Sequence, residues 1–412
     1  GNFKMPDYET YTEDETLNSM IPLWKRAKSD VSDEEEAAFY QEKFGDWNKP
    51  AKVIRSKTEG TATYTAMLFI PSRAPFNYYT KEYEKGLQLY ASGVLIMDKC
   101  ADLLPDYFSF VRGLVDSQDL SLNISREMLQ HDHQLRLIRT TLERKMKNEL
   151  SAWLKNDRSA YEEFFKNFGL QLKVGCYEAY GANKEHLQDL LLFYSAKKES
   201  MATLREYVDA MPEDQKYIYY AAGESTEKLS KLPAAENILD KGFDILYLTQ
   251  DVDEFALQMI REYDKKAFRN ISGDDLGLES ETEKEEIEAA NEAHKELFAA
   301  MKEALGDKVA EIKLSQRLKS HPVCLSTSGA LSIEMEKVLN NMPTGEKVSS
   351  RKILEINKNH KVFASLEKAF AAGDKEKVAA YTNLLYAQAL LIEGLPIEDP
   401  VAYANEVCEL MQ

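Results

Sequence analysis

Apolar residues recur at helical spacing in one long stretch of the chain. Mostly polar and basic residues lie between them, so the apolar positions share one face. These positions, three or four residues apart, are Leu135, Ile138, Leu142, Met146, Leu150 and Trp153. The pattern predicts helical structure over residues 126–165.

The region before this stretch has the composition of β-strands. Residues 61–70 (TATYTAMLFI) are rich in β-branched and aromatic side chains and are followed by a proline, which is typical of a strand. Residues 87–97 (LQLYASGVLIM) are a second strand candidate, and the polar segment 72–86 between them predicts a long loop. Residues 103–115 add a helical turn or two and another short strand. We therefore expect residues 1–125 to form one mixed α/β layer.

A strand, a helix and a second strand follow one another farther along the chain. Residues 217–222 (YIYYAA) and 243–248 (FDILYL) have strand composition, residues 226–239 have a helical pattern, and Gly242 stands where that helix should end. This spacing favours a βαβ crossover, which makes the two strands a parallel pair. Residues 166–280 are therefore predicted to form a second α/β layer.

An acidic, polar segment, residues 273–288 (GDDLGLESETEKEEIE), is the candidate boundary between two domains. It runs into a predicted helix that ends at Gly306. The apolar residues that share one face of this helix are Ile287, Ala290, Leu297, Met301 and Leu305. Two further helices close the chain, one over residues 377–393 and one that starts at Asp399, where Pro400 suits the first helical position.

Each of the two terminal helices presents an apolar face. The residues on these faces are Tyr381, Leu384, Leu385, Leu391, Tyr403, Ala404, Val407, Cys408 and Met411. A second copy of the chain can cover both faces in a four-helix bundle, because two adjacent helices at a terminus have few partners in a small domain. Packing on the rest of the same chain covers them equally well, so the pattern alone leaves both arrangements open.

The chain of 412 residues is too long for one ordinary core. The segments predict an α/β (α+β) multidomain protein. Two α/β sandwich layers, residues 1–125 and 166–280, are joined by a helical connector, residues 126–165, and together form a domain over residues 1–280. A small mixed domain over residues 281–412 follows, and a dimeric four-helix bundle is one of the two arrangements open to its last helices.

The charge balance and the cysteines narrow the class of protein. The chain carries 52 lysines and arginines against 70 aspartates and glutamates, a net charge of −18, which disfavours a nucleic-acid binder because binding phosphates needs a basic face. Its four cysteines form no CxxC pair, so neither a disulfide framework nor a structural zinc site is expected. No signal peptide or membrane-spanning run is visible. We expect a cytoplasmic protein that binds neither membranes nor nucleic acid.

The signatures of independent enzymes are missing from the sequence. It contains no GxxxxGK[ST] phosphate loop, no HExxH zinc helix, no GxSxG nucleophile turn and no dinucleotide fingerprint after a strand. His131 and His133 stand close together without a third ligand, so a solvated helix surface explains them better than a metal site. We therefore expect no metal in this chain.

One segment, residues 121–130 (SLNISREMLQ), combines a helix cap with an arginine. Asn123 or Ser125 can cap a helix there, which places Arg126 in its first turn and Gln130 one turn later on the same side. An arginine and a glutamine together at a loop-to-helix junction can bind a phosphate or orient a water molecule. An exposed arginine at a helix start is the alternative.

The same segment carries a family resemblance. It closely resembles the middle-domain signature of the ninety-kilodalton heat-shock chaperones, and further matches follow in family order from near residue 20 to the C-terminus. These matches are IPLWKR (21–26), LFIPSRAPF (68–76), GVLIMDKC (93–100), LLPDYFSFVRGLVDSQDL (103–120), DILYLTQDVDEF (244–255), QRLKSHPVCL (316–325), SRKILEINKNHKVF (350–363) and LLYAQALLIEGLPIEDP (384–400). The chain therefore resembles the middle and C-terminal domains of this family in its bacterial form.

The resemblance implies an ATP-binding N-terminal domain that this chain does not contain. The opening residues Gly1-Asn2-Phe3, without a methionine, agree with a piece of a longer protein. In the family, the arginine and the glutamine of the signature act on the γ-phosphate when the domains close, which assigns catalytic roles to Arg126 and Gln130 on the ATP of the absent domain. ATP and Mg are then cofactors of the full-length protein, and none is expected in this chain. We predict that the chain alone does not hydrolyse ATP.

Members of the family also bind partly folded client proteins on broad surfaces rather than in one pocket. The resemblance assigns client contact to Trp24, Glu254, Phe255, Leu331, Met335, Val338 and Leu339. The last four have the spacing of one amphipathic stripe, which on periodicity alone is more typical of a core. Phe255 stands where bacterial relatives carry tryptophan, so the aromatic character is kept although the residue differs.

The resemblance thus predicts a homodimeric chaperone fragment whose partners are non-native client proteins. Two other functions stay open from the residues themselves. The chain could be an independent α/β enzyme, or it could be a dimeric adaptor, in either case with an anionic ligand bound at Arg126.

Overall fold

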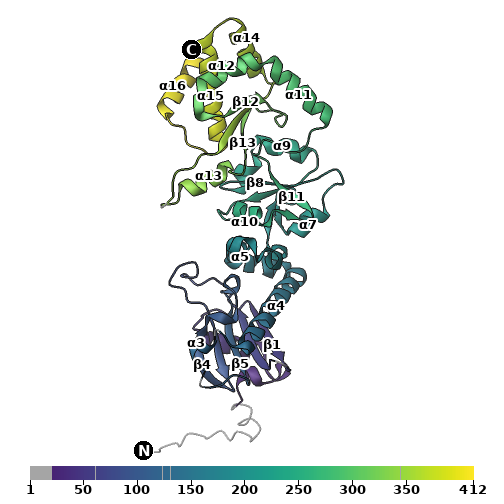
Figure 1. Cartoon of the computed structure of the whole chain (residues 1–412), viewed down its shortest axis with the longest axis vertical. Helices are drawn as coiled ribbons and strands as arrows, with labels where there is room; N and C mark the ends of the chain where they lie inside the picture. Colours follow the sequence, from purple (N-terminus) through teal and green to yellow (C-terminus); the bar gives the residue numbers. More distant parts are fainter. Residues whose placement is uncertain (1–20, 61, 123, 130, 344) are drawn as a thin grey trace, which may run out of the picture. The chain divides into compact units, whose positions relative to one another are not determined.

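The structure, a computed structural model, describes residues 21–412 apart from residues 61, 123, 130 and 344. The described strands form three sheets with helices around them, so the predicted mixed α/β class is confirmed. The chain divides into two compact units (Figure 1). The first contains the described residues up to 178 together with 182–190, and the second contains residues 179–181 and 191–412.

The sheet of the first unit has the strand order β1-β2-β5-β3-β4. Its strands are β1 (Lys52–Thr58), β2 (Tyr64–Ile70), β3 (Leu87–Ala91), β4 (Val94–Cys100) and β5 (Arg112–Ser117). β3 and β5 are parallel, and the other neighbouring pairs are antiparallel. A Cβ at Gly113 of β5 would lie 2.2 Å from the carbonyl oxygen of Met67 on β2, so only glycine allows these strands to come this close.

The prediction of a single strand over residues 87–97 is wrong. The chain turns at Ser92 and Gly93, whose φ angles are 48° and 83°, and the segment forms the β3–β4 hairpin. The N–H of Gly93 also donates to the buried carboxylate of Asp116 at 3.1 Å, which fixes the turn. A Ser-Gly pair inside an apolar run is a known turn signal.

The helices of the first unit extend the helical region that the sequence predicts. The helices that begin in this unit are α2 (Asp33–Phe44), α3 (Arg126–Leu129), α4 (His133–Asn156), α5 (Arg158–Gly181) and α6 (Lys184–Leu187), of which α3 to α6 lie in or beyond the predicted region. All the residues of the predicted apolar stripe are buried on α4, and Asp132 caps this helix by accepting a hydrogen bond from the N–H of Leu135 at 3.0 Å. The predicted helical region ends too early, at residue 165, because α5 continues to Gly181.

The first sheet of the second unit has the order β10-β11-β8-β9-β6-β7. Its strands are β6 (Phe193–Ser195), β7 (Ser200–Ala202), β8 (Ile218–Ala222), β9 (Ile245–Leu248), β10 (Glu262–Tyr263) and β11 (Lys266–Asn270). The predicted parallel pair is confirmed as β8 and β9. The helix predicted between them is divided into α8 (Thr226–Ser230) and α9 (Pro233–Asp240), because Pro233 cannot continue one helix but can begin the next. This part also contains α7 (Leu204–Asp209) and α10 (Asp253–Ile260).

The last sheet has the order β12-β14-β13, and its strands are β12 (Glu311–Leu314), β13 (Val323–Ser328) and β14 (Arg351–Ile356). The helices around it are α11 (Glu281–Ala293), α12 (Lys295–Leu305), α13 (Ile333–Asn340), α14 (Lys361–Ala371), α15 (Lys375–Ile392) and α16 (Pro400–Leu410). The predicted helix ends at Gly306 as expected but is interrupted at His294. The predicted cap of the last helix is confirmed, since Asp399 accepts a hydrogen bond from the N–H of Ala402 at 3.0 Å.

The predicted boundary segment is joined to the last sheet near its start. The N–H of Thr327 donates to the carbonyl of Ser272, and the N–H of Asp274 donates to the carbonyl of Thr327, both at 2.9 Å. Ser280 then begins α11 through a capping box with Glu283. The division into domains over residues 1–280 and 281–412 stays a prediction.

Candidate functional site

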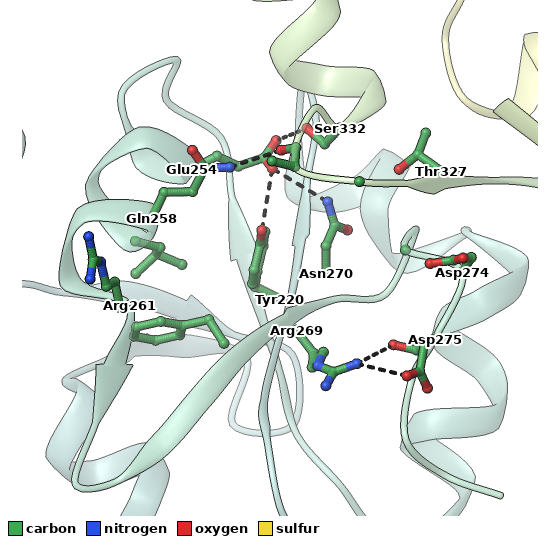
Figure 2. A pocket seen from close by; sticks show the side chains of 15 residues that line it. Tyr220, Glu254, Gln258, Arg261, Arg269, Asn270, Asp274, Asp275, Thr327 and Ser332 are labelled. Carbon is green, nitrogen blue, oxygen red and sulfur yellow. Dashed lines mark hydrogen bonds and ion pairs between the residues drawn. The ribbon is translucent and has the colours of Figure 1, made fainter. Parts of the chain in front are cut away.

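Two of the predicted site regions meet in the second unit. Glu254 lies in the first turn of α10, and Met335 lies in α13. The hydroxyl of Ser332 donates to Glu254 Oε1 at 2.9 Å and accepts a hydrogen bond from the N–H of Met335 at 3.0 Å. One side chain therefore caps α13 and holds it to α10, and Figure 2 shows Glu254 and Ser332 pointing toward each other.

The carboxyl group of Glu254 is buried, with 3% of the residue exposed. The hydroxyl of Tyr220 and the amide nitrogen of Asn270 both lie 3.4 Å from its other oxygen, Oε2. Burial raises the pKa of Glu254 to about 7; the hydrogen bond from Ser332 opposes this increase, and the negative charge of Glu334 adds to it. This junction therefore contains a carboxyl group whose charge changes near neutral pH.

A cavity of about 410 Å³ opens beside this carboxyl group. On one wall, Arg269 forms an ion pair with Asp275 at 3.4 Å and lies over the ring of Tyr217, 4.1 Å from its centroid. On the α10 wall, exposed Arg261 ends the helix with φ 66° and ψ −52°, a conformation that costs a residue with a Cβ some backbone strain. Figure 2 shows that both signs of charge border the cavity.

Gln258 of α10 forms a second link to α13. Its side-chain nitrogen donates to the carbonyl of Ala330 at 3.0 Å and lies 3.3 Å from the sulfur of Met335. Gln258 is exposed, whereas Met335 is only 4% exposed. The sulfur of this methionine is thus in contact with a side chain that itself faces solvent.

We expect Glu254 to make the stability of the second unit depend on pH. Its pKa is raised from 4.5 to about 7 in the folded protein, so the folded protein keeps a proton that the unfolded chain loses between these values. The contribution of Glu254 to stability should therefore fall by about 3 kcal/mol as the pH rises from 4.5 to 7 and stay lower above 7. The change Glu254→Gln should remove this loss, and urea unfolding of both proteins at pH 5 and pH 8 measures it. An equal difference between the two proteins at both pH values would contradict the expectation.

Trp24 lies in a buried cluster of the first unit. Its ring is 4.9 Å from that of Tyr90 and 6.1 Å from that of Phe39, and only 9% of the residue is exposed. Its indole N–H donates to buried Asp116 at 3.0 Å, and the ammonium group of Lys43 lies 5.7 Å from the ring centroid. The structure therefore places this predicted contact residue within a core, and its role in binding clients stays a prediction.

The signature segment is described only in part. Arg126 is the first residue of α3, and the hydroxyl of Ser125 accepts a hydrogen bond from the N–H of Met128 at 3.2 Å. Ser125, one of the two predicted caps, therefore caps this helix. The side chain of Arg126 and the whole of Asn123 and Gln130 lie outside the described residues. The predicted pairing of Arg126 with Gln130 on one side of the helix stays a prediction.

The remaining predicted contact residues keep part of their surface. Phe255, Leu331, Val338 and Leu339 are half-buried, and Met342, just beyond α13, is 55% exposed. Leu331 precedes α13 rather than lying in it. The apolar stripe of α13 is therefore neither fully core nor fully open.

The two terminal helices differ in how far the chain itself covers them. On α15, Leu384 and Leu385 are buried, Tyr381 is half-buried and Leu391 is 51% exposed. On α16 and just beyond it, Tyr403 and Val407 are half-buried and Met411 is 79% exposed. α16 buries none of its residues. Exposed apolar residues that the sequence analysis did not select are Ile392 (37%), Val401 (70%) and Leu410 (60%). An apolar surface is therefore left open at this end of the chain.

The comparison with known proteins decides the family. Residues 4–412 match the family described as Hsp90 protein. The chain belongs to the Hsp90 family. It is 56% identical over 405 residues to "Chaperone protein HtpG" of Oceanobacillus iheyensis. The aligned residues make up 98% of this chain and 64% of that relative. The protein of the same name from Clostridium botulinum is 55% identical, and the one from Bacillus subtilis is 53% identical. Each alignment covers 98% of this chain, and they cover 65% and 64% of the two relatives in turn.

The predicted resemblance to bacterial Hsp90 chaperones is thus confirmed. The chain spans less than two thirds of the length of these relatives. Among the described residues, no helix is long and apolar enough to cross a membrane. Within the same part of the chain, no group of three or more His, Cys, Asp or Glu side chains is arranged to hold a metal ion.

The Hsp90 resemblance did not point to several residues that build the α10–α13 junction. Ser332 could have been found, because a serine directly before an apolar helical stripe is a typical N-cap. Gln258, Tyr220 and Asn270 carry no such signal, since nothing in their own neighbourhoods indicates that they meet Glu254 or Met335.

Proposed function

We propose that the chain is the client-binding and dimerising part of an ATP-driven chaperone of the bacterial cytoplasm. Its place in the Hsp90 family and the name HtpG of its relatives support the general function. In the full-length protein, Arg126 and Gln130 act on ATP and Mg held by a domain outside this chain. The chain by itself then binds non-native proteins without hydrolysing ATP.

The finer architecture belongs to the same proposal. Two α/β layers and a helical connector make up a middle domain, and residues 281–412 make up a dimerisation domain. The exposed apolar residues of α15 and α16 support a four-helix bundle with a second copy. A bundle of this kind covers the same surface on both copies, as a two-fold interface requires.

Client binding is supported most directly by the half-covered apolar stripe of α13. Val338 and Leu339 keep part of their surface, and exposed Met342 continues the apolar surface beyond the helix. A non-native protein exposes apolar area, and flexible methionine and aliphatic side chains can adapt to many such surfaces. The charged cavity beside α13 can accept polar groups of the same polypeptide. Together they form a broad surface rather than a selective pocket.

The double change Val338→Ser and Leu339→Ser should weaken client binding by about tenfold, because two apolar contacts are lost from the surface. Fluorescence anisotropy with a labelled, permanently unfolded protein measures the affinity. The matched control is Val94→Ser with Leu95→Ser on β4, an adjacent apolar pair that is 53% and 46% exposed. If both pairs weaken binding equally, α13 has no special part in it.

A further inference from the structure

The methionine at the centre of the α13 stripe is the most covered of its apolar residues. Met335 is 4% exposed, whereas Leu331, Val338 and Leu339 are half-buried. A client that uses the whole stripe must therefore gain access to Met335. What covers this side chain decides whether access needs a large movement or a small one.

The side chain of Gln258 reaches Met335 from α10, with its amide nitrogen 3.3 Å from the sulfur. Its nitrogen carries two hydrogens, and the two acceptors within reach are the carbonyl of Ala330 and the sulfur of Met335, at 3.0 Å and 3.3 Å. Thioether sulfur is a weak acceptor, so the bond to Ala330 holds the amide in place. Figure 2 shows Gln258 reaching from α10 toward the segment before Ser332.

The helix beneath is fixed by separate contacts. Glu336 accepts hydrogen bonds from Lys352 and from the N–H of Ser350, each at 2.8 Å, and all three groups are buried. Lys337 donates to the carbonyl of Glu393 at the end of α15. These contacts do not involve Gln258, so they keep α13 in place when Gln258 rotates away.

Gln258 is exposed and can rotate about its own side-chain bonds without disturbing a core. Rotation breaks one hydrogen bond to a carbonyl near the surface, which water can replace. The movement is thus small and reversible, and the group that it releases from contact is the sulfur of an adaptable apolar side chain.

We propose that Gln258 is a lid over Met335, and that a client must displace it to contact the full stripe of α13. The lid lowers the affinity of the chain for clients and keeps one methionine from making indiscriminate contacts. It acts through one side chain while α13 stays in place. The inhibitory part of this proposal rests on client binding by α13, whereas the covering of Met335 does not.

The test compares Gln258→Ala and Gln258→Glu with the unchanged chain. Alanine removes the lid, and glutamate keeps its size but cannot donate to the carbonyl of Ala330. The first readout is the rate at which dilute hydrogen peroxide oxidises Met335, followed by mass spectrometry. Met342 and Met301, which are 55% and 0% exposed, serve as open and closed references in the same sample.

Both variants should oxidise Met335 at least about threefold faster, with Met342 and Met301 unchanged. They should also bind an unfolded protein about three- to tenfold more tightly, as expected for the loss of one ordinary hydrogen bond. The control Gln171→Ala removes a similar bond, from the side-chain nitrogen to the carbonyl of Asp106 at 3.1 Å in the first unit, and should change neither readout.

Unchanged oxidation of Met335 in both variants would overturn the lid. Faster oxidation without tighter binding would show that the cover is real but does not inhibit, which overturns the proposed regulation. If the unchanged chain and both variants all fail to bind unfolded proteins, the proposed function is wrong, and the inhibitory role falls with it. The oxidation rates then still decide whether Gln258 covers Met335.

Discussion

In the dimer that we propose, changing Leu391 and Val401 together to glutamate should separate the two copies into monomers. These residues, 51% and 70% exposed, belong to the open apolar surface of α15 and α16. A two-fold interface contains each change twice, so four carboxylates would have to be buried without partners. We expect the dimer to weaken by at least about 100-fold, which light scattering coupled to size-exclusion chromatography detects as a halved mass.

A matched control separates this effect from a general effect of added charge. Val94 on β4 is an apolar residue with 53% exposure in the first unit, and Val94→Glu should leave the mass unchanged. A chain that is already monomeric before any change would refute the proposed bundle. So would a double variant that still elutes as a dimer with its helical content intact.

The change Arg126→Ala in the full-length protein should reduce ATP turnover by about 100- to 1000-fold. A guanidinium group that reaches the γ-phosphate stabilises the charge that develops during transfer, and removing one such donor has an effect of this size. Arg126 is the first residue of α3, where Ser125 caps the helix. A coupled assay of phosphate release at saturating ATP measures the change in kcat.

The control for this experiment is Arg139→Ala, which removes an exposed arginine from α4. It should leave turnover within about twofold of the unchanged protein. A similar loss in both variants would point to a general effect of positive charge. Full activity of Arg126→Ala would remove Arg126 from the catalytic site.

The regular helices were predictable because their periodicity is local. The apolar stripe of α4 follows a spacing of three and four residues, and every one of its members is buried. The cap at Asp399 and the parallel β8–β9 pair follow from equally local signals. These elements need no knowledge of distant parts of the chain.

The breaks within elements were harder to predict. Residues 87–97 are apolar enough for one strand, yet the Ser92–Gly93 turn divides them into a hairpin. The helix before Gly306 is interrupted at His294, whose backbone leaves helical geometry with φ −107° and ψ 10°. A histidine carries no breaking signal like that of proline or glycine, so its local sequence does not indicate the interruption.

The candidate site could be predicted as separate residues but not as one arrangement. The sequence pointed to Glu254 and to Met335 through the family resemblance. The bond between Glu254 and Ser332 joins positions 78 residues apart, and the contact of Gln258 with Met335 joins positions 77 apart. Such contacts depend on how α10 and α13 pack, which no local pattern encodes. The burial of Trp24 is a similar case, because its partner Asp116 is 92 residues away.

In the proposed function, α13 and its surroundings bind non-native polypeptides. Hydrogen exchange of the chain, with and without a permanently unfolded protein, tests this most directly. We expect slower exchange over residues 331–342 when the unfolded protein is present, and unchanged exchange in the β3–β4 hairpin. Unchanged exchange over residues 331–342 at a saturating concentration of the bound protein would contradict it.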